Sequence, residues 1–102
     1  MHVVPVDQIE YIRAAGVYAE IFLCGEERRE HRLVRASLAL LESRLDPEQF
    51  CRVHRSAIVK LDEVSTLLRM GGGNSQIRLK SGTEIPVGRS RREELEARLG
   101  RV

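Results

Sequence analysis

Aromatic residues are scarce in this chain, and tryptophan is absent. Two tyrosines and two phenylalanines make up 4% of its 102 residues, whereas apolar residues as a whole make up 42%. A chain of this length forms one small domain, and this apolar content is enough for a modest core. The core must therefore rest on leucine, valine and isoleucine.

The chain has only two cysteines and no long hydrophobic run. The two cysteines, Cys24 and Cys51, both lie among apolar residues, so we expect buried, reduced thiols and no disulfide framework. No apolar run approaches the ~18 residues of a membrane-spanning helix, and the first residues lack the apolar core of a signal peptide. We therefore expect a cytoplasmic domain without a membrane segment. Because the chain starts directly on strand-like sequence, we expect residues 1–102 to be one domain of a longer protein.

The net charge is only +2, with 17 lysines and arginines against 15 acidic residues. This excess is too small to identify a nucleic-acid partner. Lys60 and Lys80 are the only lysines, so the other 15 basic residues are arginines. A guanidinium group offers a planar fork for phosphate and guanine, but a GC-rich genome would produce the same bias. The positions of the arginines are therefore more informative than their number.

The apolar pattern predicts a mainly β fold, with small antiparallel sheets and two short amphipathic helices. Pro5 and Pro86 indicate edge strands, because proline cannot donate to a ladder. Strands are expected over residues 3–6, 9–14, 17–23, 29–34, 50–53, 57–59, 64–70, 76–80 and 83–87.

Local signals place the two helices. Ser37 is suited to cap the first helix, over residues 38–45, in which leucines recur at helical spacing. Ser90 is expected to cap the second helix. Glu93 would complete a capping box there, and Gly100 would end the helix.

The stretch from Phe50 to Lys60 concentrates chemical function. Apolar runs rich in β-branched residues flank a polar centre of His54, Arg55 and Ser56, so we expect a loop held at both ends by strands. All three side chains can present hydrogen-bond donors, which suits recognition of phosphate or guanine. From the pattern alone an alternative is equally good: His54 caps a strand and Arg55 is simply solvated.

Three arginines, Arg89, Arg91 and Arg92, surround the expected start of the second helix. The helix dipole disfavours cations there, and an oxyanion such as a DNA phosphate would offset the repulsion. Alternatively, Arg91 and Arg92 pair along the helix with Glu94 and Glu96, each pair contributing roughly 0.2–0.5 kcal/mol. These two interpretations are evenly balanced. Arg89 precedes the cap and lacks such a partner, which favours a ligand role.

Catalytic and metal-binding constellations are incomplete. His54 and Ser56 lack an acid placed to orient the imidazole, and Cys51 with His54 forms only half of a zinc site. The loop 71–75 lacks the Lys-Ser/Thr pair of a phosphate-binding loop. We expect no enzymatic activity, no metal and no cofactor.

Several stretches occur in a characteristic order. They are Ile9-Glu10-Tyr11-Ile12, Gly16-Val17-Tyr18, residues 37–50, the string Arg52-Val53-His54-Arg55-Ser56-Ala57-Ile58-Val59-Lys60, and residues 79–90. Together they resemble the LytTR-type bacterial DNA-binding domain over nearly the whole chain. The string around His54 and the last stretch are the most specific.

This resemblance implies a DNA-binding output domain of a bacterial response regulator in a two-component system. Such domains read the major groove of double-stranded DNA with three loops, whose counterparts here lie at Val17-Tyr18, Arg55 and Arg89. They bind repeated sites on one DNA face, often as homodimers, and bend the duplex. The expected DNA-contacting residues are Val17, Tyr18, His54, Arg55, Ser56, Lys60, Arg89, Ser90, Arg91 and Arg92.

Some positions depart from the family pattern. Val17 stands where asparagine is frequent and cannot hydrogen-bond a base, so we expect it to pack on a thymine methyl or to leave the contact to Tyr18 on a phosphate. Lys60 replaces a frequent asparagine, Ala57 a frequent aromatic residue and Gly88 a frequent serine. None of these changes breaks the fold.

The main alternative is a non-enzymatic protein-interaction module. Salt dependence separates it from a DNA-binding domain, because each DNA phosphate contact lowers log affinity by about 0.9 per unit of log salt.

Overall fold

The computed structural model describes residues 6–24 and 31–100, and antiparallel strands are their main secondary structure. The expected strand at 3–6 and the first two residues of the expected strand at 29–34 fall outside this range, except for Val6, which starts a 3₁₀ turn, Val6–Gln8. The strands are β1 (Ile9–Ala15), β2 (Tyr18–Leu23), β3 (His31–Val34), β4 (Phe50–His54), β5 (Ala57–Lys60), β6 (Val64–Arg69), β7 (Ser75–Leu79) and β8 (Glu84–Val87), and the helices are α1 (Leu38–Arg44) and α2 (Arg92–Leu99). The predicted mainly β fold with two short helices is confirmed.

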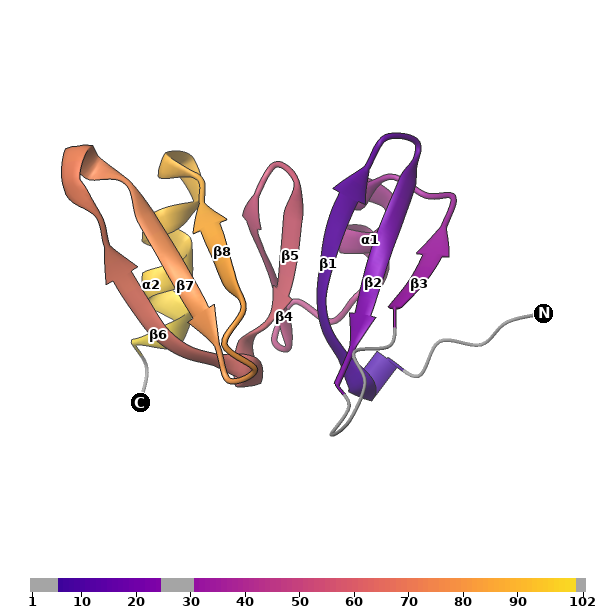
Figure 1. Cartoon of the computed structure of the whole chain (residues 1–102), viewed down its shortest axis with the longest axis horizontal. Coiled ribbons are helices and arrows are strands. Elements are labelled where there is room, and N and C mark those ends of the chain that lie inside the picture. The colour runs from indigo at the N-terminus through magenta and orange to yellow at the C-terminus, as the bar shows by residue number, and fades with distance from the viewer. Residues whose placement is uncertain (1–5, 25–30, 101–102) are drawn as a thin grey trace.

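The described strands form two sheets (Figure 1). The five-stranded sheet has the order β3-β2-β1-β5-β4, and the three-stranded sheet has the order β6-β7-β8. Every pairing is antiparallel. Neighbouring strands are mostly joined by short turns, as in a meander.

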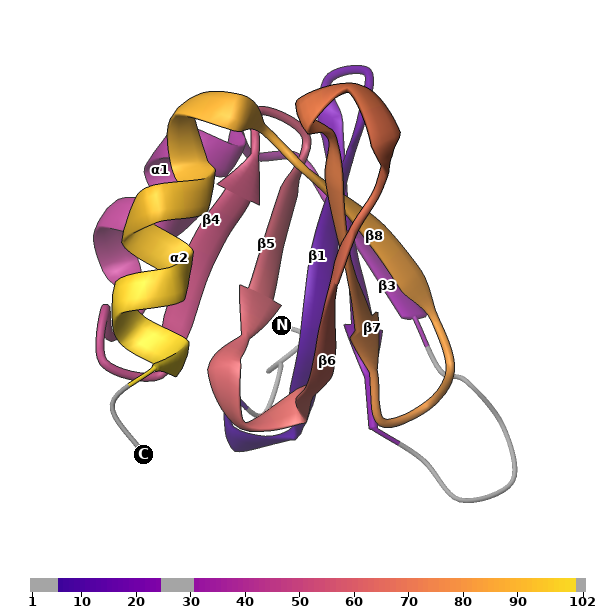
Figure 2. The ribbon, with the colours of Figure 1, turned by 90° about the vertical axis from the view of Figure 1, so that its left-hand side faces the viewer.

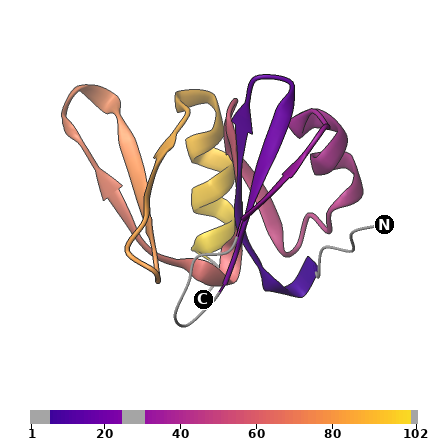
Figure 3. The same cartoon turned by 45° about the vertical axis from the view of Figure 1, so that its right-hand side comes forward.

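The central strands of the five-stranded sheet are covered on both faces, whereas the edge strand β3 is largely exposed. Helix α1 covers one face, while α2 and the three-stranded sheet pack against the other (Figure 3). Ile12 and Ile58 enter the core beneath α1, whereas Tyr11 and Val59 enter the core shared with α2. Because successive side chains of a strand point to opposite faces, a strand with two covered faces is apolar without clean alternation. This accounts for the mixed pattern of β1.

Helix α1 begins where its sequence predicts. Ser37 has an extended backbone, and its Oγ accepts a hydrogen bond from the Leu40 amide at 3.1 Å. This cap satisfies one of the free N–H groups of the first turn. After the helix, Asp46 Oδ1 accepts the Glu48 amide at 2.9 Å, and this turn delivers Phe50 into the core.

The two cysteines differ in burial. Cys51 is 3% exposed, as expected. Cys24 is exposed, so the expectation that it is buried is wrong. The residue lies one position beyond the last residue of β2, where the sheet ends.

Antiparallel pairing places alternate connections at the same end of the molecule. The β1–β2 turn, the β4–β5 turn, the β6–β7 loop Gly71–Gly73 and the β8–α2 junction at residues 88–91 all lie at one end (Figures 1 and 2). We call this surface the loop end. Among the described helices, none is long and apolar enough to cross a membrane.

Candidate nucleic-acid interface

The β4–β5 turn holds Arg55 between two residues that bond to each other. His54 Nδ1 lies 2.8 Å from Ser56 Oγ and accepts the Ser56 backbone N–H at 3.1 Å. Because a backbone N–H can only donate, Nδ1 is unprotonated in this arrangement, and the ring proton of neutral His54 lies on Nε2. The contacts between His54 and Ser56 therefore stabilise the β4–β5 turn.

Two further hydrogen bonds fix the turn from its sides. The Ala14 amide of β1 donates to the Ser56 carbonyl at 2.9 Å. Arg52 Nη2 donates to the Arg55 carbonyl at 2.7 Å. A bulge between Arg52 and His54 adds one residue to β4, and bulges of this kind re-aim neighbouring side chains. The Arg55 side chain itself is exposed and makes no ion pair with the described residues.

The β8–α2 junction lies beside this turn. The Gly88 amide donates to the Val53 carbonyl of β4 at 2.7 Å. Arg89 is exposed, and its Nη2 donates to the Gly72 carbonyl at 2.9 Å. Arg55 and Arg89 therefore project from connections at the same end, and neither is buried in an internal ion pair.

Ser90 does not cap α2. A 3₁₀ turn, Arg89–Arg91, precedes the helix, and the Arg91 amide donates to the Gly88 carbonyl at 2.9 Å. The chain thus turns helically from Gly88, which has the extended backbone typical of a cap, and α2 itself starts at Arg92 without a side-chain cap. The predicted capping box between Ser90 and Glu93 is wrong, because the junction is pinned to β4 two residues earlier.

The remaining two arginines have different partners. Arg92 Nε lies 3.2 Å from Glu96 Oε1 within α2, which confirms one of the alternative pairings. Arg91 does not pair with Glu94. Its Nη1 lies 3.7 Å from Glu42 of α1, while Glu94 pairs with Arg98 at 2.8 Å. Arg91 and Arg92 are about one-third exposed, so they retain access to solvent.

The β1–β2 turn completes the loop end. Gly16 has φ +63°, a backbone conformation that glycine adopts at little cost. It leaves Val17 63% exposed and Tyr18 44% exposed. Ala19 pairs with Val34, which places the exposed Arg35 next to Tyr18. Arg35 is not one of the predicted DNA-contacting residues, because only the pairing of β2 with β3 indicates its position.

Lys60 lies away from this surface. It is the last residue of β5, whose first residue adjoins the Arg55 turn, and its Nζ donates to the Asp7 carbonyl at 2.6 Å. The structure therefore separates Lys60 from the other nine predicted DNA-contacting residues. The Gly71–Gly73 loop, in contrast, joins the loop end through Arg89 although its sequence matched no ligand motif.

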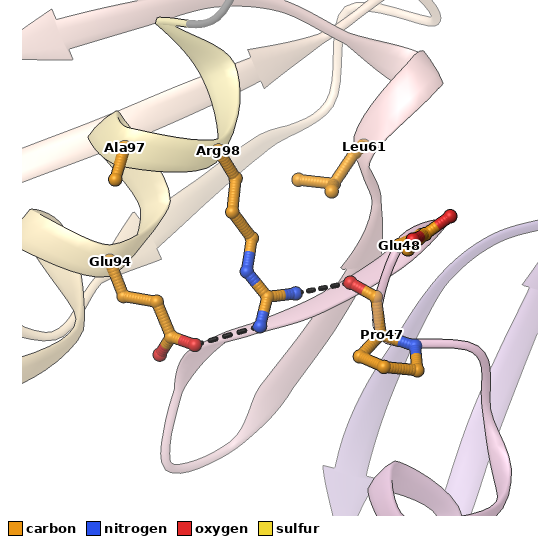
Figure 4. A pocket seen from close by; sticks show the side chains of 6 residues that line it. All are labelled: Pro47, Glu48, Leu61, Glu94, Ala97 and Arg98. Carbon is orange, nitrogen blue, oxygen red and sulfur yellow. Dashed lines mark hydrogen bonds and ion pairs between the residues drawn. The ribbon is translucent and has the colours of Figure 1, made fainter.

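A pocket of about 550 Å³ also lies away from the loop end. It is lined by Pro47, Glu48, Leu61, Glu94, Ala97 and Arg98 (Figure 4). Arg98 donates to the Pro47 carbonyl, to the Phe50 carbonyl at 3.2 Å and to Glu94 at 2.8 Å. These bonds tie α2 to the segment before β4, so we assign Arg98 a structural role.

Neither cysteine is set up as a nucleophile. Burial raises the pKa of the Cys51 thiol, although Arg98 opposes the shift. Partial burial and the Glu63 carboxylate raise the pKa of Cys24. A nucleophilic cysteine needs a lowered pKa. Within residues 6–24 and 31–100, no group of His, Cys, Asp and Glu side chains could hold a metal ion.

Comparison with known proteins gives a consistent family. Residues 1–100 match the family described as LytTr DNA-binding domain. The chain is 38% identical over 81 residues to a CO-responsive transcriptional regulator, RcoM, of Rhodospirillum rubrum, covering 78% of this chain and 33% of the relative. It is 28% identical over 90 residues to an uncharacterised response regulatory protein of Vibrio cholerae, covering 88% of this chain and 34% of the relative. The chain thus spans about a third of the length of these relatives.

The fold has a solved counterpart. A Bacillus cereus chain described as the LytTr DNA-binding domain of a methyl-accepting/DNA response regulator superposes with a TM-score of 0.81 at 24% identity, covering 95% of this chain and 85% of that chain.

Proposed function

Because the chain belongs to the LytTR DNA-binding domain family, we propose that it binds double-stranded DNA sequence-specifically, with Arg55 and Arg89 in the major groove. The observation that carries this proposal is the shared placement of the two guanidinium groups. Both project from hydrogen-bonded connections of the loop end, and both are exposed. A bidentate pair between arginine and guanine O6 and N7 is the commonest specific contact to DNA.

Preorganisation supports the role of both arginines. The Arg55 backbone is held by Arg52 and by the neighbouring Ser56 carbonyl. Arg89 uses Nη2 for the Gly72 carbonyl and keeps most of its five N–H donors. Fixing the side chain or its backbone before binding reduces the entropy lost on association.

The other residues of the loop end have supporting roles in the proposal. Arg91 and Arg92 contact phosphates, which position a protein on DNA without reading sequence. Val17 packs on a thymine methyl, and Tyr18 contacts a phosphate of the DNA backbone. His54 and Ser56 hold the β4–β5 turn in shape. Ser90 faces the same major groove of the DNA as Arg55 and Arg89. Lys60 is left outside the interface, because it donates to Asp7 at the opposite end.

We further propose that the domain acts as the output part of a longer cytoplasmic transcription regulator. From its resemblance to the LytTR family, we also propose that the domain binds repeated sites on one DNA face, often as a homodimer, and bends the duplex.

Selection of bound sequences from random duplex DNA tests the proposal directly. A defined motif, present twice with regular spacing, is expected. Mobility shifts of the selected site placed at different positions in one fragment then report bending. A featureless selection, with an affinity that hardly depends on salt, would reject DNA reading and favour the protein-interaction module.

A further inference from the structure

Glu42 of α1 lies between two arginines, Arg52 of strand β4 and Arg91 of the β8–α2 junction. Its Oε1 is 3.4 Å from Nη1 of Arg52, and its Oε2 is 3.7 Å from Nη1 of Arg91. Arg52 in turn donates from Nη2 to the Arg55 carbonyl at 2.7 Å. One carboxylate therefore connects the turn that carries Arg55 with the junction that carries Arg89.

The position of Arg52 depends on this connection. Its side chain is only 17% exposed, and its buried Nε has no hydrogen-bond partner among the described residues. A largely buried guanidinium that loses its acidic partner is driven toward water. Movement of Arg52 would also release the Arg55 carbonyl, since the same guanidinium makes both contacts.

We propose that Glu42 is a positioning residue that couples the Arg55 turn to the Arg89 junction and thereby sets the specificity of DNA binding. This inference rests on the proposed function. Glu42 itself is expected to make no favourable contact with DNA, because its carboxylate repels phosphate. Its removal should therefore weaken binding to the selected site while leaving binding to random DNA unchanged or stronger.

The substitution Glu42→Gln tests the inference. Glutamine keeps the shape of the side chain but lacks the charge that holds two guanidinium groups. We expect the ratio of specific to non-specific affinity to fall roughly three- to tenfold, since each exposed or partly exposed pair contributes up to about 1 kcal/mol and 1.4 kcal/mol is tenfold. Glu48→Gln is the matched control. Glu48 is exposed and its side chain makes no ion pair with described residues, so the ratio should stay unchanged.

A double-mutant cycle separates positioning from a general structural role. The effect of Glu42→Gln should be smaller in an Arg55→Ala background, because part of it is transmitted through the Arg55 turn. Equal effects in both backgrounds, an unchanged ratio, or a parallel loss of both kinds of binding with a lowered Tm would each overturn the inference. If the unaltered chain selects no preferred sequence, the proposed function fails and not this coupling alone.

Discussion

Nη2 of Arg89 donates a hydrogen bond to the carbonyl oxygen of Gly72 at 2.9 Å. One guanidinium group thereby ties the β8–α2 junction to a loop that lies 17 residues earlier in the chain. Gly72 has φ +74°, in the left-handed region that glycine adopts readily. The direction of Arg89 therefore depends on a glycine that no DNA-binding motif would single out.

Substitution of Gly72 should disturb this anchor. Gly72→Ala meets only Asn74 Nδ2 at 3.9 Å, so space is available, and the cost comes from the positive φ. We expect a loss of roughly 1 kcal/mol in the free energy of unfolding, or about 4–8 °C in Tm, together with weaker specific DNA binding.

Gly71→Ala provides the control for this experiment. Gly71 has no positive φ, and an added Cβ meets nothing within 4 Å. The Tm of the Gly71→Ala variant, measured by calorimetry, should match or exceed that of the unaltered chain. Equal losses for the two variants would contradict the assigned role of the Gly72 backbone.

Removal of the base-reading arginines should lower specificity. Arg55→Ala and Arg89→Ala are each expected to cost about 1–3 kcal/mol on the selected site and to relax preference at one guanine position. Mobility shifts on the selected site and on single-base variants measure both effects. Arg44→Ala is the control, because Arg44 is an exposed residue in the last turn of α1. An unaltered shift for both test variants would refute the interface.

The two arginines at the start of α2 should affect DNA binding differently from Arg55 and Arg89. Arg92→Gln is expected to weaken binding to all sequences alike, because phosphate contacts carry no sequence information. Arg91→Gln should weaken binding in the same way and should also lower specificity, because it removes one of the two arginine partners of Glu42. Each lost contact should reduce the slope of log affinity against log salt by about 0.9. Fluorescence anisotropy over a salt series measures this slope. A loss confined to one sequence would argue for base contact instead.

The pKa of Cys51 predicts how stability depends on pH. Because burial raises the pKa of this thiol in the folded chain, the folded state holds the proton more tightly than the unfolded chain. The resulting stability is fully present below the ordinary thiol pKa of about 8.5 and is lost as pH rises through the folded pKa. Urea unfolding between pH 7 and 11 should show a decline that Cys51→Ala reduces. Cys24→Ala should change it less, since Cys24 is exposed, and a reversed order would contradict the assignment.

Short-range patterns predicted much of the fold. The apolar runs identified the described strands, and Ser37 marked the start of α1. A loop between two strands was predicted around residues 54–56, and the structure has a turn at Arg55 and Ser56, directly after His54, the last residue of β4. These features depend on neighbours within a few residues, where backbone preference and side-chain spacing act together.

The same local reasoning failed at the start of α2. Ser90 and Glu93 have the spacing of a capping box, yet the hydrogen bond from the Gly88 amide to the Val53 carbonyl starts the helical turn earlier. A contact with a neighbouring strand outweighed a local preference of about 1 kcal/mol.

The sequence by itself determined that this chain is a small, mainly β domain with an arginine-bearing turn and a second arginine cluster. Only the tertiary structure decided which arginines share a surface and which are engaged. Antiparallel pairing brings Arg55 and Arg89 to one end and sends Lys60 to the other, while Glu42 captures Arg91 from another helix. Ion pairs and strand pairing bring together residues that are distant in sequence. The spacing of residues along the chain therefore does not predict these contacts.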